Sequence, residues 1–356
     1  MAGANGSLEV LASFIRNYQK KANIMEVCGT HTFQFFATGI RDMLPEGVRL
    51  LSGPGCPVCV TPNSYIDRAK EIAKRYDVII ATFGDMLKVP GSDMKSLAHL
   101  KAEGADIRVV YSPEDAVRIA ASEDRPVVFL SVGFETTIPT AAAALMLAEQ
   151  EGIKNFYMLP SHKLIIPALR ALLEDKKAQI DGFILPGHVS AIIGRRPYEP
   201  VLKEYGKPGV ITGFEAHHLI IGTAILLKLI QSGRVEVINA YPEVVREEGN
   251  PEAWALVERF FEPADERWRG FGLIPLSGHR FREDFSHRDA ARTFPVDVPP
   301  ERETPGCRCP DVVKGKAEPT DCPHFGKGCT PLHPLGPCMV SSEGACAAYY
   351  KYRRQV

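Results

Sequence analysis

The sequence predicts an α/β protein built from two similar parallel-sheet domains that face a cleft, followed by an irregular or helical cysteine-rich segment. Short runs rich in valine and isoleucine recur through the first two thirds of the chain, and helix-like stretches separate them. Such alternation is typical of parallel sheets whose two faces are both covered. Six of the nine cysteines fall in the last 50 residues, where apolar periodicity has faded. The chain therefore ends in a segment of different character.

Nine runs have the length of a strand and lack strict alternation of apolar and polar residues, as expected for strands buried on both faces. They comprise residues 24–27, 48–51, 78–81, 107–111, 127–132, 156–159, 182–185, 209–212 and 235–239. One large sheet could hold nine strands, but two smaller α/β units fit a length of 356 residues better.

Helices are expected between the strands and just after them. Residues 63–76 are amphipathic, and residues 140–151 are rich in alanine behind Pro139, which suits a first helical turn. The same character recurs at residues 113–122, 163–173 and 252–261.

The expected domains are residues 1–122, residues 123–245 and residues 246–356, with a soft boundary near residue 122. The last of them is rich in proline, glycine and charged residues, and its regular periodicity is lost from Phe281 onward. A segment so poor in apolar periodicity needs another source of order, which a metal centre would supply.

Composition excludes several classes of function. The formal net charge is −1 and 24% of the residues are charged. The chain therefore lacks the excess of positive charge that would indicate a nucleic-acid partner. The sequence contains no run of about 18 apolar residues, so no membrane-spanning helix is predicted. The first ten residues lack the pattern of a signal peptide. A cytoplasmic protein is expected, in which the nine cysteines stay reduced or serve metal and redox chemistry.

The C-terminal cysteines are dense enough to hold a metal centre. They are Cys307, Cys309, Cys322, Cys329, Cys338 and Cys346. Thiolates are soft ligands that suit iron–sulfur clusters or zinc, and the paired spacing usual for zinc is absent from this region. Four thiolates would satisfy a [4Fe-4S] cluster and leave two thiols over, which could form a reducible disulfide. The alternative is a structural zinc site with two incidental cysteines.

A second group of thiols lies upstream. Cys56 and Cys59 form a Cys-Pro-Val-Cys pair on a turn that follows a strand and leads into a helix. A helix N-terminus lowers the pKa of a nearby thiol, so the pair could cycle between dithiol and disulfide. It could instead bind a metal, or be half of a structural zinc knuckle.

Cys28 and His31 lie in the sequence CGTHT, directly after the first strand. Together they could bind one metal, or His31 could activate the thiol as a base. A single cysteine at a strand end is commonly just a small buried residue. Because Cys56 and Cys59 follow the next strand, the two strand ends are expected to converge.

Other strand ends also carry polar residues. Glu135 lies in GFETT at residues 133–137, Glu215 follows a second Gly-Phe pair, and His188 lies in PGHVS at residues 186–190. Turn formation and helix capping explain such residues adequately. The functional alternative places them in a shared cleft, because open α/β sheets bind ligands at the carboxyl ends of their strands.

Together these motifs resemble the HypD family of hydrogenase maturation factors. The matching segments are CGTHT at residues 28–32, GPGCPVC at 53–59, GFETT at 133–137, PGHVS at 186–190 and the six-cysteine tail. They span nearly the whole chain in the family's order. The resemblance implies two similar α/β domains and a C-terminal iron–sulfur segment, in agreement with the pattern of the chain.

The resemblance further implies assembly of the Fe(CN)2CO group of [NiFe] hydrogenases, together with the partner HypC and with cyanide delivered by HypE. Cys28 would bind the iron of the nascent group, and Cys56 and Cys59 would be the redox-active pair beside it. The remaining cleft residues would be His31, Glu135, His188 and Glu215.

By the same likeness, four tail cysteines would bind the [4Fe-4S] cluster and two would form an extra pair. The ligands would be Cys307, Cys322, Cys329 and Cys346, and the pair would be Cys309 and Cys338. We expect an assembly scaffold with redox-active thiols rather than a stand-alone enzyme. The alternatives are a cluster-dependent thiol–disulfide reductase and a zinc-stabilised interaction module.

Overall fold

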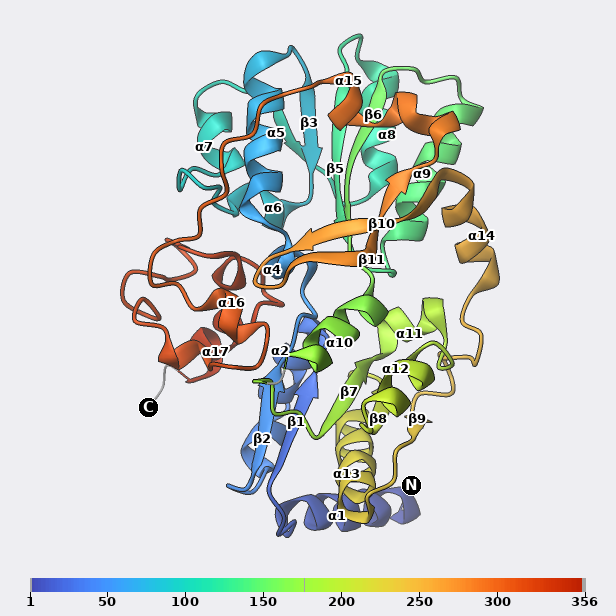
Figure 1. Ribbon diagram of the computed structural model, residues 1–356, viewed down its shortest axis with the longest axis vertical. Coiled ribbons are helices and arrows are strands. Elements are labelled where there is room, and N and C mark those ends of the chain that lie inside the picture. The colour runs from blue at the N-terminus through green and yellow to red at the C-terminus, as the bar shows by residue number, and fades with distance from the viewer. Residues whose placement is uncertain (1, 176, 354–356) are drawn as a thin grey trace.

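The computed structural model describes residues 2–175 and 177–353. Two parallel sheets form two lobes, and the cysteine-rich tail lies beside the region where the lobes meet (Figure 1). This arrangement confirms the predicted fold class of two parallel-sheet α/β units with an irregular C-terminal segment.

The first sheet has the strand order β2-β1-β7-β8-β9, and its neighbouring strands pair in parallel. Its strands are β1 (Ala22–Glu26), β2 (Val48–Ser52), β7 (Gly182–Pro186), β8 (Gly209–Thr212) and β9 (Val237–Asn239). The second sheet is also parallel and has the order β4-β3-β5-β6. Its strands are β3 (Ile79–Thr82), β4 (Ile107–Val109), β5 (Val127–Gly133) and β6 (Phe156–His162).

All nine predicted strands are present, as are the five predicted helices, with ends shifted by a few residues. These helices are α5 (Asn63–Arg75), α8 (Pro113–Ser122), α9 (Ile138–Gln150), α10 (Ile165–Glu174) and α14 (Pro251–Phe260). Local chemistry explains the clearest boundary. Ser112 accepts a hydrogen bond from the Asp115 amide and Pro113 occupies the first turn of α8, so both the cap and the fixed backbone angle favour a helix there.

The other helices of the two lobes were not predicted. They are α1 (Ala2–Arg16), α2 (Gly29–Ala37), α3 (Ile40–Met43), α4 (Pro57–Val60), α6 (Gly84–Lys88), α7 (Leu97–Ala102), α11 (Gly187–Ile193), α12 (Tyr198–Glu204), α13 (Ala216–Ser232), the 3-10 helix η1 (Glu283–Arg288) and α15 (Ala290–Thr293). Two of them, α2 and α4, begin at the cysteine motifs.

The sheets do not follow the boundary expected near residue 122. In the first sheet β1 pairs with β7, so residues 22–52 and residues 182–239 build one unit. The second sheet uses the chain between them, from β3 to β6. The ranges 1–122 and 123–245 therefore each contribute strands to both sheets. The physical reason is that buried apolar strands pair wherever packing brings them together, which sequence order does not fix.

The segment expected to begin at residue 246 starts with ordered structure. After α14, an antiparallel hairpin forms from β10 (Phe261–Trp268) and β11 (Gly272–Phe281). It packs against β6 of the second lobe and against α10, which in turn contacts α12 of the first lobe, so the hairpin lies between the two lobes (Figure 1). Half-buried and exposed residues alternate along β10 between the buried Phe261 and Trp268, which is the pattern of a strand with one face towards a core.

Between residues 301 and 353 the tail contains only short elements. These are α16 (Cys309–Val312), η2 (Pro319–Asp321), η3 (Pro337–Met339) and α17 (Ala345–Arg353). α17 contacts α2, and η3 contacts α4, so the tail packs on both upstream cysteine motifs. Among the described residues, none of the helices has the length and apolar character needed to cross a membrane.

One apolar cluster joins the three parts of the molecule. It includes Val27 of the first lobe, Leu130 of the second lobe and Met339 of the tail, all at most 5% exposed. Burying such a side chain stabilises a fold by about 1.5–3 kcal/mol. The two lobes and the tail therefore share a core, which holds the strand ends of both sheets close to the tail.

Candidate metal and thiol redox site

The first cysteine motif lies at a topological switch point. From β1 the chain moves to β2 on one side of the first sheet and later returns to β7 on the other side. Ligands of open α/β sheets bind outside the carboxyl ends of the strands at such a point. Cys28 follows β1 and His188 follows β7, so both motifs belong to this edge.

Cys28 is the N-cap residue of α2 and is only 7% exposed. The backbone amides of Thr30 and His31 donate hydrogen bonds to its sulfur, which favours the thiolate. Burial outweighs them and raises the pKa of Cys28 to about 12, with a smaller contribution from the nearby carboxyl of Glu343. The free thiol is therefore protonated at neutral pH, and a bound metal ion would have to displace the proton.

Two carboxyl groups fix the turn that carries Cys28. Glu26 is buried and accepts hydrogen bonds from the Cys28 amide, at 3.2 Å, and from the Thr32 hydroxyl. Burial raises the pKa of Glu26 to about 8. From the tail, Glu343 accepts a hydrogen bond of 2.9 Å from the Thr30 hydroxyl. The turn is thus held from the strand on one side and from the tail on the other.

Two glycines allow close approach of neighbouring segments to this turn. A Cβ atom on Gly29 would lie 2.4 Å from the Glu343 Cβ atom, and one on Gly55 would lie 2.2 Å from the Cys28 backbone nitrogen. Side chains cannot be accommodated at these distances. The Cys28 turn therefore touches both the tail and the segment that leads into the Cys56–Cys59 motif, as expected from convergence of the first two strand ends.

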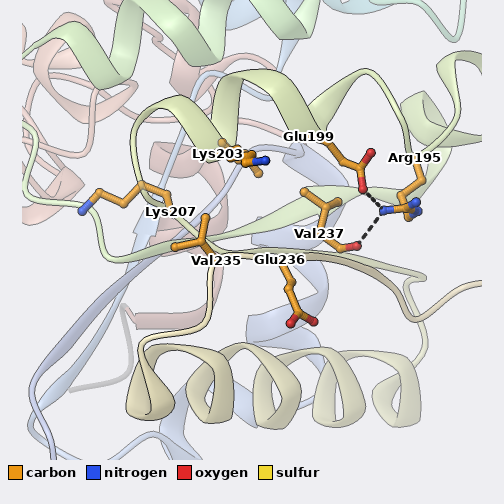
Figure 2. Close-up of a pocket in the computed structure, with 8 residues that line it drawn as sticks. Arg195, Glu199, Lys203, Lys207, Val235, Glu236 and Val237 are labelled. Carbon is orange, nitrogen blue, oxygen red and sulfur yellow. Dashed lines mark hydrogen bonds and ion pairs between the residues drawn. The ribbon is translucent and has the colours of Figure 1, made fainter.

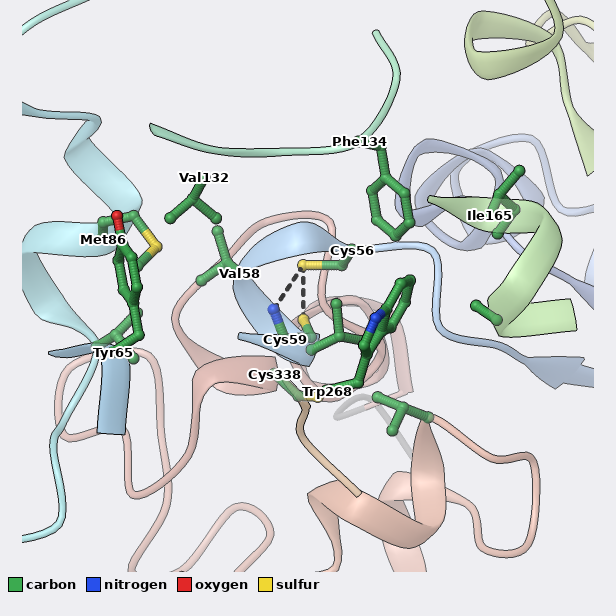
Figure 3. Packing of buried hydrophobic residues seen from close by; sticks show 14 of the residues in the cluster. Cys56, Val58, Cys59, Tyr65, Met86, Val132, Phe134, Ile165, Trp268 and Cys338 are labelled. Carbon is green, nitrogen blue, oxygen red and sulfur yellow. Dashed lines mark hydrogen bonds between the residues drawn. The ribbon is translucent and has the colours of Figure 1, made fainter. Parts of the chain in front are cut away.

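Cys56 is the N-cap residue of the four-residue helix α4, and Cys59 lies within that helix. Their sulfur atoms are 2.6 Å apart, and both residues are buried free thiols. Burial raises the pKa of Cys59 well above its usual value. Figure 3 shows this pair in the apolar cluster with Phe134 and Trp268, whose ring centroids lie 5.8 Å apart.

The tail cysteines surround one cavity. Its lining includes Cys307, Cys309, Cys322, Cys329, Cys338 and Cys346, together with Phe325, Leu335 and Met339. Side-chain hydrogen bonds join Cys307 to Cys309, Cys309 to Cys338, and Cys338 to Cys346. The six residues that were singled out in the sequence therefore do meet in space.

The two thiol groups are in direct contact. Cys338 also makes a side-chain hydrogen bond with Cys59. An unbroken line of thiols thus leads from Cys56 through Cys59, Cys338 and Cys309 to the tail cavity. Cys309 and Cys338, at 3% and 1% exposed, are the members of the tail group that stand between the cavity and the upstream pair.

The chemistry of the cavity fits an iron–sulfur cluster. Within the described chain, no group of three or more His, Cys, Asp or Glu side chains is arranged to hold a single metal ion. A four-iron cluster does not require the thiolates to converge on a single ion. Each iron binds one thiolate, so the four sulfur atoms surround a cavity that holds the cluster. His324, which also lines this cavity, already places its Nε2 atom 2.8 Å from the Pro305 carbonyl oxygen.

His31 and His188 flank a phenylalanine at the first switch point. The Phe214 ring stacks on His31 at 4.7 Å and on His188 at 3.8 Å between ring centroids. His31 Nε2 lies 3.0 Å from the Gly213 carbonyl oxygen, so this nitrogen carries the proton. Burial lowers the pKa of His31 to about 4. The imidazole of His31 thus contacts the turn after β8, while its backbone amide contacts Cys28.

The two glutamates expected in the cleft lie in different environments. Glu135 is 2% exposed; its Oε1 accepts a hydrogen bond of 2.8 Å from the Ile165 amide, and burial raises its pKa to about 7. Tyr198 is within electrostatic range of both Glu135 and Cys28. By contrast, the Glu215 side chain is 76% exposed and lies 3.4 Å from His217. The structure thus buries Glu135 and leaves Glu215 at the surface.

Sequence reasoning missed several residues that shape the site. Glu26 carried a usable signal, because a carboxylate ends a largely apolar strand two residues before Cys28. Glu343, Phe214 and Trp268 had no comparable local signal. Their roles arise from contacts between segments far apart in the chain.

A separate pocket lies away from these motifs. It is lined by Arg195, Glu199, Leu202, Lys203, Lys207, Val235, Glu236 and Val237, and has a volume of about 440 Å³ (Figure 2). Lys207 precedes β8 and Val237 begins β9, so the pocket is at the amino ends of these parallel strands. The thiol motifs lie at the opposite, carboxyl ends.

Comparisons with known proteins agree with the arrangement of these motifs. The sequence model of HypD, described as "Hydrogenase formation hypA family", matches residues 5–353. The chain is 45% identical over 345 residues to the hydrogenase expression/formation protein HupD of Azotobacter chroococcum mcd 1, covering 94% of this chain and 90% of that protein.

Two hydrogenase maturation factors named HypD are similarly close. Identity is 45% over 344 residues with the protein of Azotobacter vinelandii, covering 95% of this chain and 91% of that one. It is 46% over 341 residues with the protein of Rhodobacter capsulatus, covering 94% and 90%. A family match over nearly the whole chain, with relatives of this similarity, shows that the chain belongs to the HypD family of hydrogenase maturation factors.

Proposed function

We propose that the protein holds iron together with HypC and supports assembly of the Fe(CN)2CO group, accepting cyanide that HypE delivers. One observation carries the proposal. The line of thiols from the tail cavity to Cys59 ends beside the turn of Cys28, which Gly55 touches. Electrons from the tail would thereby reach the Cys56–Cys59 pair next to Cys28, the thiol that would bind the iron.

The tail would hold a [4Fe-4S] cluster through Cys307, Cys322, Cys329 and Cys346. The four residues line a common cavity, which supports this assignment. The other two tail cysteines, Cys309 and Cys338, form a hydrogen bond with each other, and Cys338 forms a further hydrogen bond with Cys59. When bound, such a cluster supplies electrons one at a time.

The remaining thiols can pass two electrons by exchange. The Cys338 thiolate attacks the Cys59 sulfur of an oxidised Cys56–Cys59 pair, which forms a mixed disulfide and releases the Cys56 thiolate. Cys309 then attacks Cys338, and Cys59 is released. The upstream pair gains two electrons and two protons, and the Cys309–Cys338 pair is left as the disulfide. The hydrogen bonds along this line place each attacking sulfur beside its target.

Cys28 would bind the iron that is being built into the Fe(CN)2CO group, as the substrate of the assembly. A thiolate is the soft ligand that such iron prefers. Glu26 and the amides of Thr30 and His31 hold the turn in place. The protein then acts as a scaffold with redox-active thiols rather than as a stand-alone enzyme, and its free cysteines suit a reducing cytoplasm.

Replacement of Cys28 tests this function. Co-purified with HypC from cells that express the maturation proteins, the Cys28→Ala variant should lose the cyanide and carbonyl infrared bands of the complex. The matched control is Thr38→Ala, at the far end of α2, which should keep them. Bands of full intensity in the Cys28→Ala complex would exclude Cys28 as the iron ligand.

A cluster-dependent thiol–disulfide reductase remains the second candidate, because the contact between Cys59 and Cys338 would serve it equally well. It predicts turnover of disulfide substrates without HypC. The zinc-stabilised module predicts a colourless protein that contains zinc but no iron. Anaerobic purification followed by assays of iron, sulfide and zinc separates these cases.

A further inference from the structure

The tip of the β10–β11 hairpin lies at the junction of the two thiol groups. Trp268, the last residue of β10, belongs to the apolar cluster that contains Cys56, Cys59 and Cys338 (Figure 3). Two residues later, a Cβ atom on Gly270 would lie 2.9 Å from the Pro310 carbonyl oxygen, next to Cys309. The hairpin tip therefore contacts both the upstream pair and the tail.

Arg269, between them, binds both sides of this junction. Its backbone amide donates to the Val60 carbonyl at 2.7 Å, directly after Cys59. Its Nη2 atom donates to the Thr61 carbonyl at 3.0 Å and also to Asn63. Its Nη1 atom lies 2.5 Å from the Glu303 carboxylate, four residues before Cys307. One side chain thus ties the end of α4 to the start of the tail.

The charge of Arg269 is unusually placed. The residue is only 3% exposed, and within residues 2–175 and 177–353 its buried Nε atom has no hydrogen-bond partner. The carboxylate of Glu303, with which it forms an ion pair, is 41% exposed, so water weakens the compensation of its charge. The cation is close enough to Cys307 to lower the pKa of that thiol, although the hydrogen bond with Cys309 and burial raise it overall.

Addition of electrons to a disulfide or a cluster adds negative charge, which a buried cation stabilises. We propose that Arg269 is a positioning residue for electron transfer between the tail and the Cys56–Cys59 pair, and that its buried charge raises the reduction potential of the tail centre. This inference rests on the proposed function, since it takes the tail to hold a cluster. Its two parts, charge and position, are separable by substitution.

The charge is tested by the midpoint potential of the tail cluster, measured by redox titration of anaerobically purified full-length protein. Arg269→Gln should shift the one-electron equilibrium about tenfold towards the oxidised form, or ~59 mV more negative. Glu303→Gln, which leaves the cation less compensated, should shift it the opposite way. Arg267→Gln is the matched control, because Arg267 is an exposed residue of the same hairpin. Unchanged midpoints, or shifts of the same sign in Arg269→Gln and Glu303→Gln, overturn the electrostatic role.

Position is tested with Arg269→Lys, which keeps the charge but cannot form the same fork of hydrogen bonds. After dithionite reduces the tail, the Cys56–Cys59 disulfide takes two electrons and two solvent protons, and alkylation with mass spectrometry follows the new thiols. The variant should keep the wild-type midpoint within error and form these thiols at least tenfold more slowly. A wild-type rate overturns the positioning role.

The outcomes also separate this inference from the function on which it rests. If wild-type protein lacks a cluster, the proposed function fails. If the cluster spectrum is normal in all variants but potential and rate do not change, only the role of Arg269 fails. Should Arg269→Gln not fold, Glu303→Gln decides the electrostatic part and Arg269→Lys the positional part.

Discussion

Buried ionisable side chains cluster around the thiols, and their protonation states follow from desolvation. Glu26 and Glu135 have pKa values raised to about 8 and about 7, while the pKa of His31 is lowered to about 4. In each case burial penalises the charged form most strongly. Near neutral pH the side chains of Glu26 and His31 are therefore largely uncharged, and burial keeps the Cys28 thiol protonated.

Glu135 should make stability depend on pH. Its folded pKa of about 7 lies above the usual 4.5, so between these values the folded protein holds a proton that the unfolded chain has released. Stability then falls as pH rises through this window, by up to about 3 kcal/mol. Glu135→Gln keeps an oxygen for the Ile165 amide and removes the titration.

Urea unfolding of wild type and variant from pH 4.5 to pH 8 measures the effect. The free energy of unfolding of wild type, minus that of Glu135→Gln, should decline as pH rises across this range. The same difference between wild type and the exposed control Glu215→Gln should stay constant. Parallel curves for Glu135→Gln and wild type would contradict the raised pKa of the buried Glu135 carboxyl.

At the scale of elements, strands end where turns and short helices begin, and the site is made of these ends. α2 and α4 both start at a cysteine that serves as N-cap residue, and both are held by segments from elsewhere in the chain. α17 packs on α2 through the ring pair of Phe36 and Tyr349, with centroids 4.9 Å apart. The tail thereby stabilises the helix that begins at Cys28.

Gly29→Ala should disrupt the packing of the tail on α2. The new Cβ atom would overlap the Glu343 backbone oxygen, at 2.6 Å, and overpacking of this kind costs about 1–3 kcal/mol. We expect faster hydrogen exchange of backbone amides in residues 341–349 and a lower unfolding midpoint.

Gly84→Ala provides the matched control. Gly84 is likewise the first residue of a helix after a strand, but the nearest atom to its new Cβ atom, on Val109, is 3.8 Å away. Its tail should exchange as in wild type. Equal exchange in both variants would show that the tail tolerates displacement at Gly29.

At the scale of the molecule, two sheets and a tail meet so that thiols from distant parts of the chain touch. The chain crosses from the first lobe to the second after α4, returns at β7, and crosses again before α14, which packs on α9 of the second lobe (Figure 1). These crossings place α4 between the lobes and let the hairpin and the tail pack around it. The topology thus brings the cysteine motifs together although they are far apart in the sequence.

The contact between Cys59 and Cys338 predicts a specific cross-link. A Cys56→Ser/Cys309→Ser variant removes Cys56 as a partner for Cys59 and Cys309 as a partner for Cys338, so mild oxidation should join Cys59 to Cys338. Peptide mass spectrometry under non-reducing conditions should find residues 59 and 338 in one linked species.

The control variant Cys56→Ser/Cys59→Ser/Cys309→Ser retains Cys28 and Cys338, and should give no link between those two residues. If the Cys56→Ser/Cys309→Ser variant shows no link at full oxidation, the tail does not lie against α4 in solution and Cys59 does not contact Cys338.

Much of the fold was predictable because strands and amphipathic helices leave local patterns. The nine strands were visible as apolar runs, and α8 was visible from Ser112 and Pro113. The hairpin was missed, since β10 contains Pro263 and four charged residues among its eight. Only its position over β6 gives one face of this strand a core to pack on.

The sequence by itself determined the chemistry: two groups of thiols, the strand ends that carry them, and the family to which the chain belongs. The tertiary structure alone decided that β1 pairs with β7, that Cys59 touches Cys338, and that Glu135 is buried while Glu215 is exposed. The physical reason is the separation in sequence between the residues that make contact. Local pattern records how a residue is buried relative to its neighbours in sequence, whereas contacts between distant segments depend on how whole lobes pack.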